Sequence, residues 1–446
     1  MNVDKLKWTI IIIFIIFIAL AILAVLGWNN RRSSDGTGNH FDRAYELVQG
    51  TPAEARVFGR SDESILSDKY RPLASLFESA SGLKPSVHND IEIITEGKRK
   101  YDLLIEDIQN AKESIHMEYF HFGIDKGSRA IREALIAKAK QGVKVRFIYD
   151  NIANIPIPPV YFWSMRFAGV EVRRYTGLHR IIPDLNYRDH RKVVVIDGKI
   201  AYTGGMNIND HYFKDWRDTH LRLTGDAVYS LQYNFLDMWM HSGGSVTEDI
   251  AGLFPEHDVT EELPVQIVPD GPDAPDAPFP VIQTGLEWIA ENAEDYLYIQ
   301  TPYLVPSDST LEAMKTATGN GVDVRIMIPQ NSDMATMGYI NRSFYKECLQ
   351  LGIRIFERAG EFMHSKTLVS DDYLSSVGSA NIDPRSLDLC YELNAYMYDK
   401  PTALKNKEIF LNDLSLCKEI TEEVLKGYDF IEKGLQRFFR LFAPLV

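Results

Sequence analysis

The sequence is poor in cysteine and has no excess of positive charge. Its three cysteines, Cys348, Cys390 and Cys417, are too few and too scattered for a disulfide framework or a thiolate metal site. Asp and Glu outnumber Lys and Arg by 62 to 48 over 446 residues, so the formal net charge is −14. Proteins that hold nucleic acid by its phosphates normally carry a basic surface, and nucleic acid is therefore not an expected partner.

The chain as a whole also lacks the biased composition of a disordered or fibrous protein. Hydrophobic residues make up 45% of the chain and charged residues 25%. These proportions exclude a mainly disordered or fibrous protein, and the length leaves room for two packed domains.

One stretch near the N-terminus lacks charge altogether. From Trp8 to Trp28, 21 consecutive residues are uncharged and mostly aliphatic, with tryptophan at both ends. A helix of this length crosses a hydrocarbon core of about 30 Å, and tryptophan favours the membrane interface. The run is longer than the apolar part of a typical signal peptide, which is the alternative, so we expect a retained transmembrane helix over 8–28. Two basic residues flank it on each side, which leaves its orientation undetermined.

Beyond this segment, residues 29–89 are interpreted as a tether and an N-terminal extension to which the pattern assigns no role. Regular alternation begins at Asp90, and alternating strands and helices predict a layered α/β sheet. Residues 254–281 hold seven prolines and many acidic residues, a composition typical of a linker. The predicted strands of the first part are 91–94, 114–120 and 143–149, and the predicted helices are 100–111 and 128–140.

The alternation starts again after the proline-rich interval. The segment GVDVRIMI at Gly321 matches GVKVRFIY at Gly142, and other strands repeat in the same order. The chain therefore contains two diverged copies of one α/β unit. We expect one domain over 90–253 and a second over 282–446, with a C-terminal helix at its end.

The two copies agree best around two histidines. The first reads HRKVVVIDGKIAYTGGMNIND from His190, and the second reads HSKTLVSDDYLSSVGSANIDP from His364. Counted from each histidine, both have lysine at +2, aspartate at +7, glycine at +14, asparagine at +17 and an acid at +28, without a gap. A lone His-Lys-Asp triplet is weak evidence, whereas two copies that share the other positions indicate a functional site. These residues are Lys192, Asp197, Asn207 and Asp218 in the first copy, and Lys366, Asp371, Asn381 and Glu392 in the second.

The spacing predicts which of these side chains share a site. HRKVVVI has the β-branched run of a strand, and residues two apart on a strand point to the same side, so His190 and Lys192 face one site. Asp197 falls on the opposite parity at a turn, and we interpret it as a scaffold residue. The segments around Gly205 and its counterpart Ser379 supply short side chains and backbone donors where a bulky group must approach.

Two histidines, two lysines and two asparagines around a pseudo-twofold axis suit a phosphodiester. The lysines and asparagines can hold the non-bridging oxygens, while one neutral imidazole attacks phosphorus and the other, protonated, donates to the leaving alkoxide. The acids at +28 can orient the imidazoles through their second nitrogens. A metal site is the alternative, but so many cationic groups around one point would repel a divalent ion. We therefore expect neither a metal nor another cofactor.

These residues resemble the duplicated HxKxxxxD signature of the phospholipase D superfamily, and the flanking sequence is most similar to its bacterial cardiolipin synthase branch. The resemblance covers about four-fifths of the chain, from Asp90 to the C-terminus. Members of the branch commonly have two N-terminal membrane spans, where this sequence has one hydrophobic span. The stretches that carry the resemblance include HMEYF at His116, YRDHRKVVVIDG at Tyr187, IQTPYLVP at Ile299 and GSANIDPRS at Gly378.

The resemblance implies two pseudo-symmetric α/β sandwich domains, each a mixed sheet flanked by helices, and a two-step phosphatidyl transfer without metal. His190 is implied as the nucleophile that releases glycerol from phosphatidylglycerol, with His364 as general acid and then as base for a second phosphatidylglycerol, which gives cardiolipin. The pseudo-symmetry leaves open which histidine has which role. The candidate catalytic residues are His190, Lys192, Asp197, His364, Lys366 and Asp371, and the candidate phosphate-binding or orienting residues are Asn207, Asn381, Asp218, Glu392, Gly205 and Ser379.

Two other activities of the superfamily remain open. A hydrolytic phospholipase D would use the same intermediate but admit water, and an endonuclease would cut a DNA backbone. The acidic charge and the expected membrane helix argue against the nuclease. The expected partners are phosphatidylglycerol and anionic membrane lipid, and the expected location is a bacterial cell membrane, with a single span.

Overall fold

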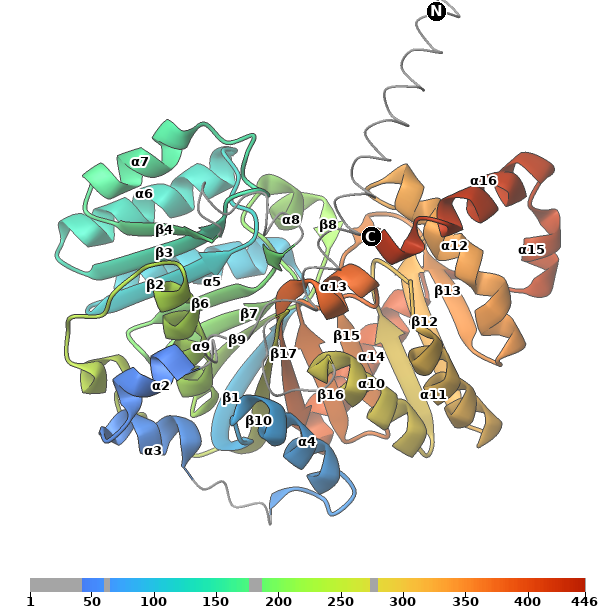
Figure 1. The fold of residues 1–446 in the computed structure, drawn as a ribbon, viewed down its shortest axis with the longest axis horizontal. Coiled ribbons are helices and arrows are strands. Elements are labelled where there is room, and N and C mark those ends of the chain that lie inside the picture. The colour runs from blue at the N-terminus through green and yellow to red at the C-terminus, as the bar shows by residue number, and fades with distance from the viewer. Residues whose placement is uncertain (1–41, 60–64, 176–186, 273–279, 446) are drawn as a thin grey trace, which may run out of the picture.

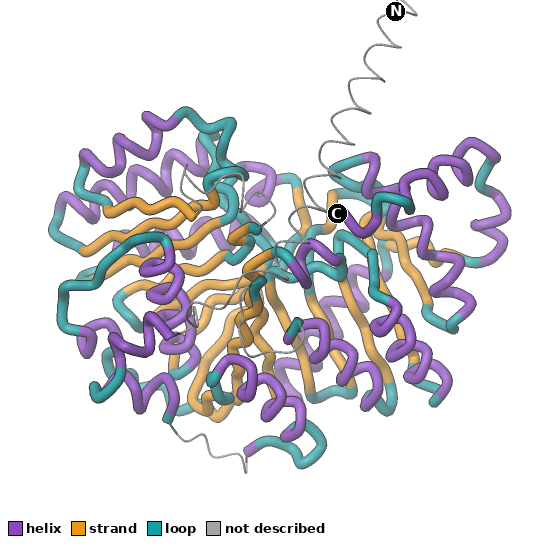
Figure 2. Tube along the Cα trace, in the orientation of Figure 1, coloured by secondary structure: helices purple, strands orange, loops and turns teal. Residues whose placement is uncertain are grey.

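The computed structural model describes residues 42–59, 65–175, 187–272 and 280–445 (Figure 1). The predicted transmembrane helix over 8–28 lies outside these residues. Among the helices that the structure describes, none has the length and apolar character needed to cross a membrane. The described chain forms layers of helices around one extended, mixed sheet (Figure 2).

The strands of the two copies follow one another in mirrored order across this sheet. The first copy contributes the order β4-β3-β2-β6-β7-β9-β1, and the second continues as β10-β17-β16-β15-β11-β12-β13-β18. β1 pairs antiparallel with β10 at the centre, so the copies are related by a pseudo-twofold axis there. The first-copy strands are β1 (Ser86–Ile94), β2 (Ser114–Tyr119), β3 (Lys144–Asp150), β4 (Glu171–Tyr175), β6 (Lys192–Ile196), β7 (Ile200–Gly204) and β9 (His220–Gly225). The second-copy strands are β10 (Glu262–Asp270), β11 (Tyr296–Gln300), β12 (Asp323–Pro329), β13 (Arg354–Arg358), β15 (Thr367–Ser370), β16 (Leu374–Gly378), β17 (Cys390–Tyr398) and β18 (Cys417–Ile420).

Helices cover both faces of the sheet, which explains why its central strands are apolar without alternation. In β6, Val194 and Ile196 belong to the core beneath α5 to α7, whereas Val193 and Val195 belong to the core beneath α9. The helices of the first copy are α5 (Gly97–Asn110), α6 (Lys126–Lys140), α7 (Pro159–Phe167) and α9 (Ala227–His241). Those of the second are α10 (Val281–Asn292), α11 (Asp308–Gly319), α12 (Ala335–Gln350) and α14 (Lys400–Leu414).

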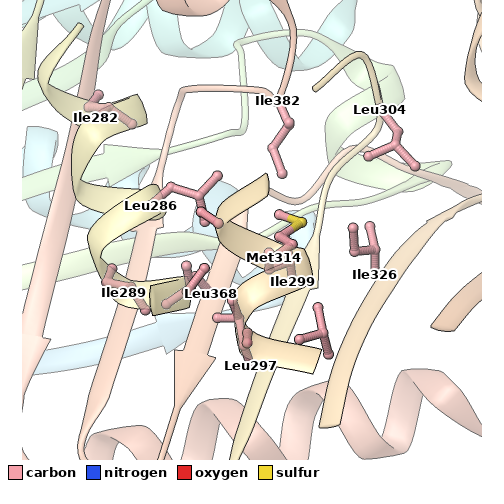
Figure 3. Packing of buried hydrophobic residues seen from close by; sticks show 14 of the residues in the cluster. Ile282, Leu286, Ile289, Leu297, Ile299, Leu304, Met314, Ile326, Leu368 and Ile382 are labelled. Carbon is pink, nitrogen blue, oxygen red and sulfur yellow. The ribbon is translucent and has the colours of Figure 1, made fainter. Parts of the chain in front are cut away.

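The second copy repeats this packing. Figure 3 shows Ile282, Leu286 and Ile289 of α10 beside Leu297 and Ile299 of β11 in one buried cluster. The alternate residues of β11, which include Tyr298, belong to a separate cluster with α14. The period-two alternation of each strand thus fills two cores, one on each side of the sheet.

The described part of the N-terminal extension packs on both copies. Helices α2 (Asp42–Val48) and α3 (Pro52–Phe58) pack against α9 of the first copy. Helix α4 (Arg71–Ser81) packs against α10 of the second, where Phe77 is fully buried. The segment to which the sequence pattern assigned no role therefore contributes to the cores of both halves.

The proline-rich interval 254–281 differs from a uniform linker, because it contains the central strand β10. Its residues 265–270 pair continuously with β17. Proline lacks an N–H donor and is tolerated in a sheet mainly at edges and bulges. Pro264 lies at such a bulge, where the pairing with β1 shifts between Ser86↔Val265 and His88↔Glu262. Val265, Ile267 and Val268 are buried in β10, and Pro269 lies within its pairing with β17, so this part of the interval is a strand.

Candidate active site

A short parallel β-ladder places His190 next to the second copy. Strand β5 (Arg188–Asp189) pairs with the start of β17, where Cys390 lies opposite Arg188. The backbone N–H of His190 then donates to the carbonyl of Tyr391 at 3.0 Å. This pairing brings His190 Nδ1 to 2.9 Å from Oε1 of Glu392, the next residue on β17.

An equivalent ladder carries His364 to the first copy. Strand β14 (Phe362–Met363) pairs in parallel with β8 (Trp216–Arg217). The N–H of His364 donates to the carbonyl of Arg217 at 2.7 Å. His364 Nδ1 lies 2.8 Å from Oδ2 of Asp218.

Each histidine is therefore paired with the acid of the other copy. The expectation that the acids at +28 contact the imidazoles agrees with these distances, and the exchange of partners is what the structure adds. Both carboxylates are fully buried, and the side chains of His190 and His364 are only 13% and 7% exposed. Neither half contains a complete His-carboxylate pair by itself.

The two carboxylates are held differently. Glu392 accepts a hydrogen bond from the hydroxyl of Ser379, which itself accepts from the backbone N–H of Leu393 at 3.0 Å. Asp218 accepts from the N–H of Thr219 at 2.7 Å and lies against Gly205. A Cβ at Gly205 would approach Asp218 Oδ1 to 2.2 Å, so glycine is required there for space. The shorter acid thus faces a glycine, and the longer acid faces a hydroxyl.

The motif lysines lie buried beneath the histidines. Lys192 donates to the carbonyl of His190, and Lys366 Nζ lies 2.5 Å from the carbonyl of His364 and 2.9 Å from its Nε2. Burial lowers the pKa of Lys192 to about 8 and that of Lys366 to about 7, although Glu392 and Asp218 act in the opposite direction. Both lysines can therefore exchange protons near neutral pH.

The electrostatics favour neutral histidines in the resting site. Burial lowers the pKa of His190, although Glu392 opposes this effect. Burial and the adjacent Lys366 lower the pKa of His364 to about 3. Burial also opposes ionisation of Glu392, but His190 and Lys192 outweigh it and hold the pKa of Glu392 below its usual value. A neutral His190 that donates through Nδ1 to Glu392 carries its free lone pair on Nε2.

The asparagines at +17 have unequal surroundings. Asn207 donates to the hydroxyl of Tyr212 at 2.9 Å, and its Oδ1 accepts from the N–H of His121 at 3.2 Å. Asn381 also lines the site, and its buried Oδ1 has no hydrogen-bond partner among the described residues. The first asparagine is thus engaged within the protein, while the second offers an unused oxygen.

Asp197 and Asp371 lie beyond β6 and β15, at the ends away from the histidines. Asp197 accepts hydrogen bonds at 2.8 to 2.9 Å from three consecutive N–H groups that precede β2. Asp371 does the same at 2.9 to 3.1 Å before β11 and also binds Lys69 at 2.8 Å. Both have positive φ, 53° and 52°, which aspartate tolerates better than most residues. This geometry fits the scaffold interpretation of Asp197 and brings neither aspartate to the histidines, so a part for either residue in catalysis stays a prediction.

A cavity of about 520 Å³ opens between the two histidines. Residues beside the motifs that the sequence reasoning did not single out line its walls. Arg188 and Trp216 each lie two residues before a motif residue, so the same parity argument that placed Lys192 could have identified them. Within the described ranges, no group of three or more His, Cys, Asp or Glu side chains is arranged to hold a metal ion. The added lining residues include Phe120, Arg188, Tyr212, Trp216, Asp333, Met334 and Arg385.

Known proteins are similar to this chain in sequence and in fold. The family described as "Cardiolipin synthase, PLD-like domain" matches residues 104–239 and 289–414, one segment in each copy. The major cardiolipin synthase ClsA of Bacillus subtilis (strain 168) is 38% identical over 80% of this chain and 76% of its own length. A cardiolipin synthase of Staphylococcus aureus (strain Mu50) is 34% identical over 98% of this chain and 90% of its own.

Solved structures show the same architecture at low sequence identity. The crystal structure of the phosphatidylserine synthase of Haemophilus influenzae Rd KW20 matches with a TM-score of 0.62 and 16% identity. The match covers 84% of this chain and all of that one. A polyphosphate kinase of Porphyromonas gingivalis matches with a TM-score of 0.52 and 14% identity, over 80% of this chain and 53% of its own.

Proposed function

Because the chain belongs to the cardiolipin synthase family of phospholipase D-like proteins, we propose that it transfers a phosphatidyl group between two phosphatidylglycerol molecules, giving cardiolipin and glycerol. The observation that carries this proposal is the pair of crossed His-carboxylate contacts beside one cavity. Two imidazoles are available there, one for nucleophilic attack and one for proton transfer. The two buried lysines can neutralise the charge of the phosphodiester.

In the first step, His190 Nε2 attacks the phosphorus of the donor lipid. The N–P bond forms as the bond from phosphorus to the glycerol oxygen breaks, and His364 gives a proton to that oxygen. His364 must gain this proton in the substrate complex, because its pKa is about 3 in the resting site. The negative phosphodiester supplies the cause, since an opposite charge nearby raises the pKa of an imidazole.

In the second step, the hydroxyl of another phosphatidylglycerol attacks the phosphatidyl-histidine. The new O–P bond forms as the N–P bond to His190 breaks, and the hydroxyl proton passes to His364. If water attacked instead, the product would be phosphatidic acid, which is the hydrolytic alternative. The same residues thus support either outcome, and the acceptor decides between them.

Two contrasts support His190 as the nucleophile. No described residue makes a hydrogen bond to His190 Nε2, whereas Lys366 Nζ lies 2.8 Å from Nδ1 and 2.9 Å from Nε2 of His364. The side chain of His190 is also the more exposed of the two. A free, partly accessible lone pair suits a nucleophile, while a ring fixed by several neighbours suits an acid and base.

The test is a product analysis on the full chain in mixed micelles, with phosphatidylglycerol labelled in the head group and, separately, in the acyl chains. Cardiolipin with one free glycerol per molecule formed is the expected result, and the His190→Ala variant should form neither. Phosphatidic acid with glycerol would replace the proposed transferase by a phospholipase. Neither product from active-site-intact protein would exclude phosphatidylglycerol as the donor.

The same proposal includes membrane attachment through a single span over 8–28. Helix α16 (Phe430–Arg440) is held on the domain by ion pairs, since Arg440 binds Glu347 of α12 at 2.6 Å and Glu432 binds Arg342 at 3.2 Å. Phe439 packs on the domain, whereas Phe430 and Ile431 are 90% and 70% exposed. Such an outward apolar face suits a membrane interface. Sedimentation of the chain with membranes after alkaline carbonate washing is expected, and release into the supernatant would contradict the span.

A further inference from the structure

Two arginines that act electrostatically on each other line the cavity that holds His190. Arg188 precedes His190 by two residues and is only 6% exposed. Arg385 lies on the short helix α13 (Pro384–Asp388), which leads to β17, and is half-buried. Both line the cavity together with His190 and Cys390. Two guanidinium groups therefore add positive charge to the site beyond the motif lysines.

Neither arginine is paired with a carboxylate in the described chain. The side chain of Arg188 makes one hydrogen bond there, from Nη1 to the carbonyl of Tyr187 at 2.9 Å. Arg385 makes no side-chain hydrogen bond or ion pair with the described residues. The remaining guanidinium nitrogens of both arginines are not among the enclosed polar atoms that lack a partner in the described chain, so an anion in the cavity can reach them.

The nearest acids serve the backbone instead. Asp150 accepts from the N–H groups of Ile152 and Ala153 at 2.9 and 2.8 Å, and Asp383 accepts from the N–H of Ser386 at 2.7 Å. Burial raises the pKa of each acid to about 6. Arg188 and Arg385 act electrostatically on Asp150 and Asp383 and oppose that rise in pKa, but no hydrogen bond joins either pair in the described chain. The guanidinium donors are therefore available to a ligand.

The arginine pair occurs on one side of the pseudo-twofold axis only. Position −2 from the histidine is Arg188 in the first copy and Phe362 in the second. Position +4 from the asparagine is Arg385 in the second copy and His211 in the first. The motif residues are duplicated because both work on one phosphorus, whereas this basic pair is single. A single basic pair fits a second anion that enters the site once per reaction.

We propose that Arg188 and Arg385 bind the phosphate of the acceptor phosphatidylglycerol. This inference rests on the proposed function. The donor phosphate occupies the histidine and lysine groups, so the remaining phosphate in the reaction is the one attached to the attacking glycerol. Arginine suits this task because its planar fork binds two phosphate oxygens at once. The pair thereby favours a lipid acceptor over water and over free glycerol, neither of which carries a phosphate.

The arginines transfer no proton in this scheme. The acceptor oxygen forms its bond to phosphorus as the N–P bond to His190 breaks, and the proton moves to His364, as for any alcohol. Their contribution is to position the acceptor hydroxyl, and they act as specificity residues for the second step. The first step, formation of the phosphatidyl-histidine, needs neither of them.

The experiment compares two acceptors that share one intermediate. The full chain is given phosphatidylglycerol in mixed micelles together with radiolabelled glycerol, and two products are measured: cardiolipin, and phosphatidylglycerol that has gained labelled glycerol by exchange. Arg188→Gln and Arg385→Gln should each lower cardiolipin formation roughly tenfold or more, the loss expected for a charge-assisted phosphate contact. Glycerol exchange should stay within about twofold of the unmodified chain, since a neutral acceptor needs no second phosphate site.

Two controls keep the result specific. Arg129→Gln removes the same charge from the exposed surface of α6 and should change neither product. Arg385→Lys keeps the charge but loses the fork, so it should recover only part of the cardiolipin formation. If Arg188→Gln fails to fold because the residue is buried, Arg385→Gln alone decides the question.

Each outcome separates this inference from the proposed function. Equal losses of both products in the arginine variants would overturn it, because the residues would then serve the donor or the fold. Unchanged cardiolipin formation would overturn it as well. An unmodified chain that exchanges glycerol but makes no cardiolipin would refute the proposed function itself, and the acceptor site would fall with it.

Discussion

The two sides of the active site share a backbone frame and differ in the side chains placed on it. Arg188 lies opposite Cys390 in one crossing ladder, and Phe362 lies opposite Trp216 in the other. The second pair is apolar and packed, with ring centroids 4.8 Å apart, and the Trp216 ring lies 5.6 Å from that of His364. The first pair leaves a guanidinium in the cavity. At equivalent positions, Trp216 packs against the ring of His364 on one side, and Arg188 adds a positive charge to the cavity on the other.

The two copies share the motif residues and differ in the side chains that flank them. The duplicated frame delivers two histidines, two lysines and two acids to one point, which makes the centre nearly symmetric. A transfer reaction is not symmetric, since one imidazole must bond to phosphorus while the other moves a proton. The flanking side chains break the symmetry and give the two histidines different surroundings.

The largest expected effect is the loss of either histidine, and it also tests their division of labour. His190→Ala and His364→Ala should each reduce cardiolipin formation at least about a thousandfold, because nucleophile and acid act in series. With a phosphatidyl donor whose leaving group is nitrophenolate, which needs no acid, His364→Ala should still release nitrophenol in a single turnover and His190→Ala should not. The reverse result would exchange the two roles.

The melting temperature provides the control for these variants. His190→Ala removes a partly exposed ring, so its melting temperature should stay within a few degrees of the unmodified chain. A large fall would mean that the lost activity reflects lost structure.

The next largest effect on turnover is expected at Gly205, which faces Asp218, and a smaller one at Ser379, which faces Glu392. Gly205→Ser should lower kcat about a hundredfold, because its Cβ would lie 2.2 Å from Asp218 Oδ1 and displace the partner of His364. Ser379→Gly removes only the hydroxyl that donates to Glu392 and should cost about tenfold or less. Rates measured under saturating lipid would check this order. Equal effects would show that the two acids are supported in the same way.

The motif aspartates should affect stability and not chemistry. Asp197→Ala and Asp371→Ala each strand three backbone donors, and each should lower the free energy of unfolding by about 2 to 4 kcal/mol. The loss should be larger for Asp371, which also binds Lys69. Denaturant titration gives the stability, and turnover per folded molecule should change less than about threefold. A hundredfold loss of turnover would restore these residues to the catalytic set.

The contribution of Asp371 to the free energy of unfolding should decrease as the pH falls. Burial opposes its ionisation, but Lys69 and the backbone donors outweigh burial and hold its pKa below the usual value. Its contribution to stability is therefore complete above the unfolded pKa of about 4 and is lost as the pH falls through the lower folded value. The stability difference between the unmodified chain and Asp371→Ala should accordingly shrink in acid.

Replacing the two motif lysines should change the free energy of unfolding by a smaller amount, which differs between them. The folded pKa is about 7 for Lys366 and about 8 for Lys192, both below the value of about 10.5 in an unfolded chain. The unfolded chain binds more protons between these limits, so stability rises with pH over that range. Lys366→Met should therefore raise the free energy of unfolding by about 1 kcal/mol at pH 7, and Lys192→Met by less, although both abolish activity. Urea titrations at pH 7 and pH 9 would check the order.

Chelation should have the smallest effect. The two imidazoles on opposite sides of the cavity perform the attack and the proton transfer, so EDTA should leave the rate of cardiolipin formation unchanged. If EDTA abolished activity and a divalent ion restored it, the roles assigned to both imidazoles would be contradicted.

Most of the local architecture could be predicted from sequence, because it depends on neighbours in the chain. The run after His190 alternates between two cores as its β-branched pattern predicts, and Asp197, at the opposite parity, accepts from backbone N–H groups away from the histidines. The strand around Val265 lies in the interval that the prolines mark as a linker. Its pairing at the centre of the sheet depends on β1 and β17, which lie more than a hundred residues away on either side.

The sequence by itself determined the identity and spacing of the reactive residues, since a duplicated motif and the parity of a strand are local properties. Only the tertiary structure decided that His190 is paired with Glu392 and His364 with Asp218. It also decided that Arg188 and Arg385, nearly two hundred residues apart, line the same cavity. The reason is that the ladders β5–β17 and β8–β14 cross between the copies. Such contacts form only when both halves pack about the pseudo-twofold axis, and no local pattern records which partner lies across it.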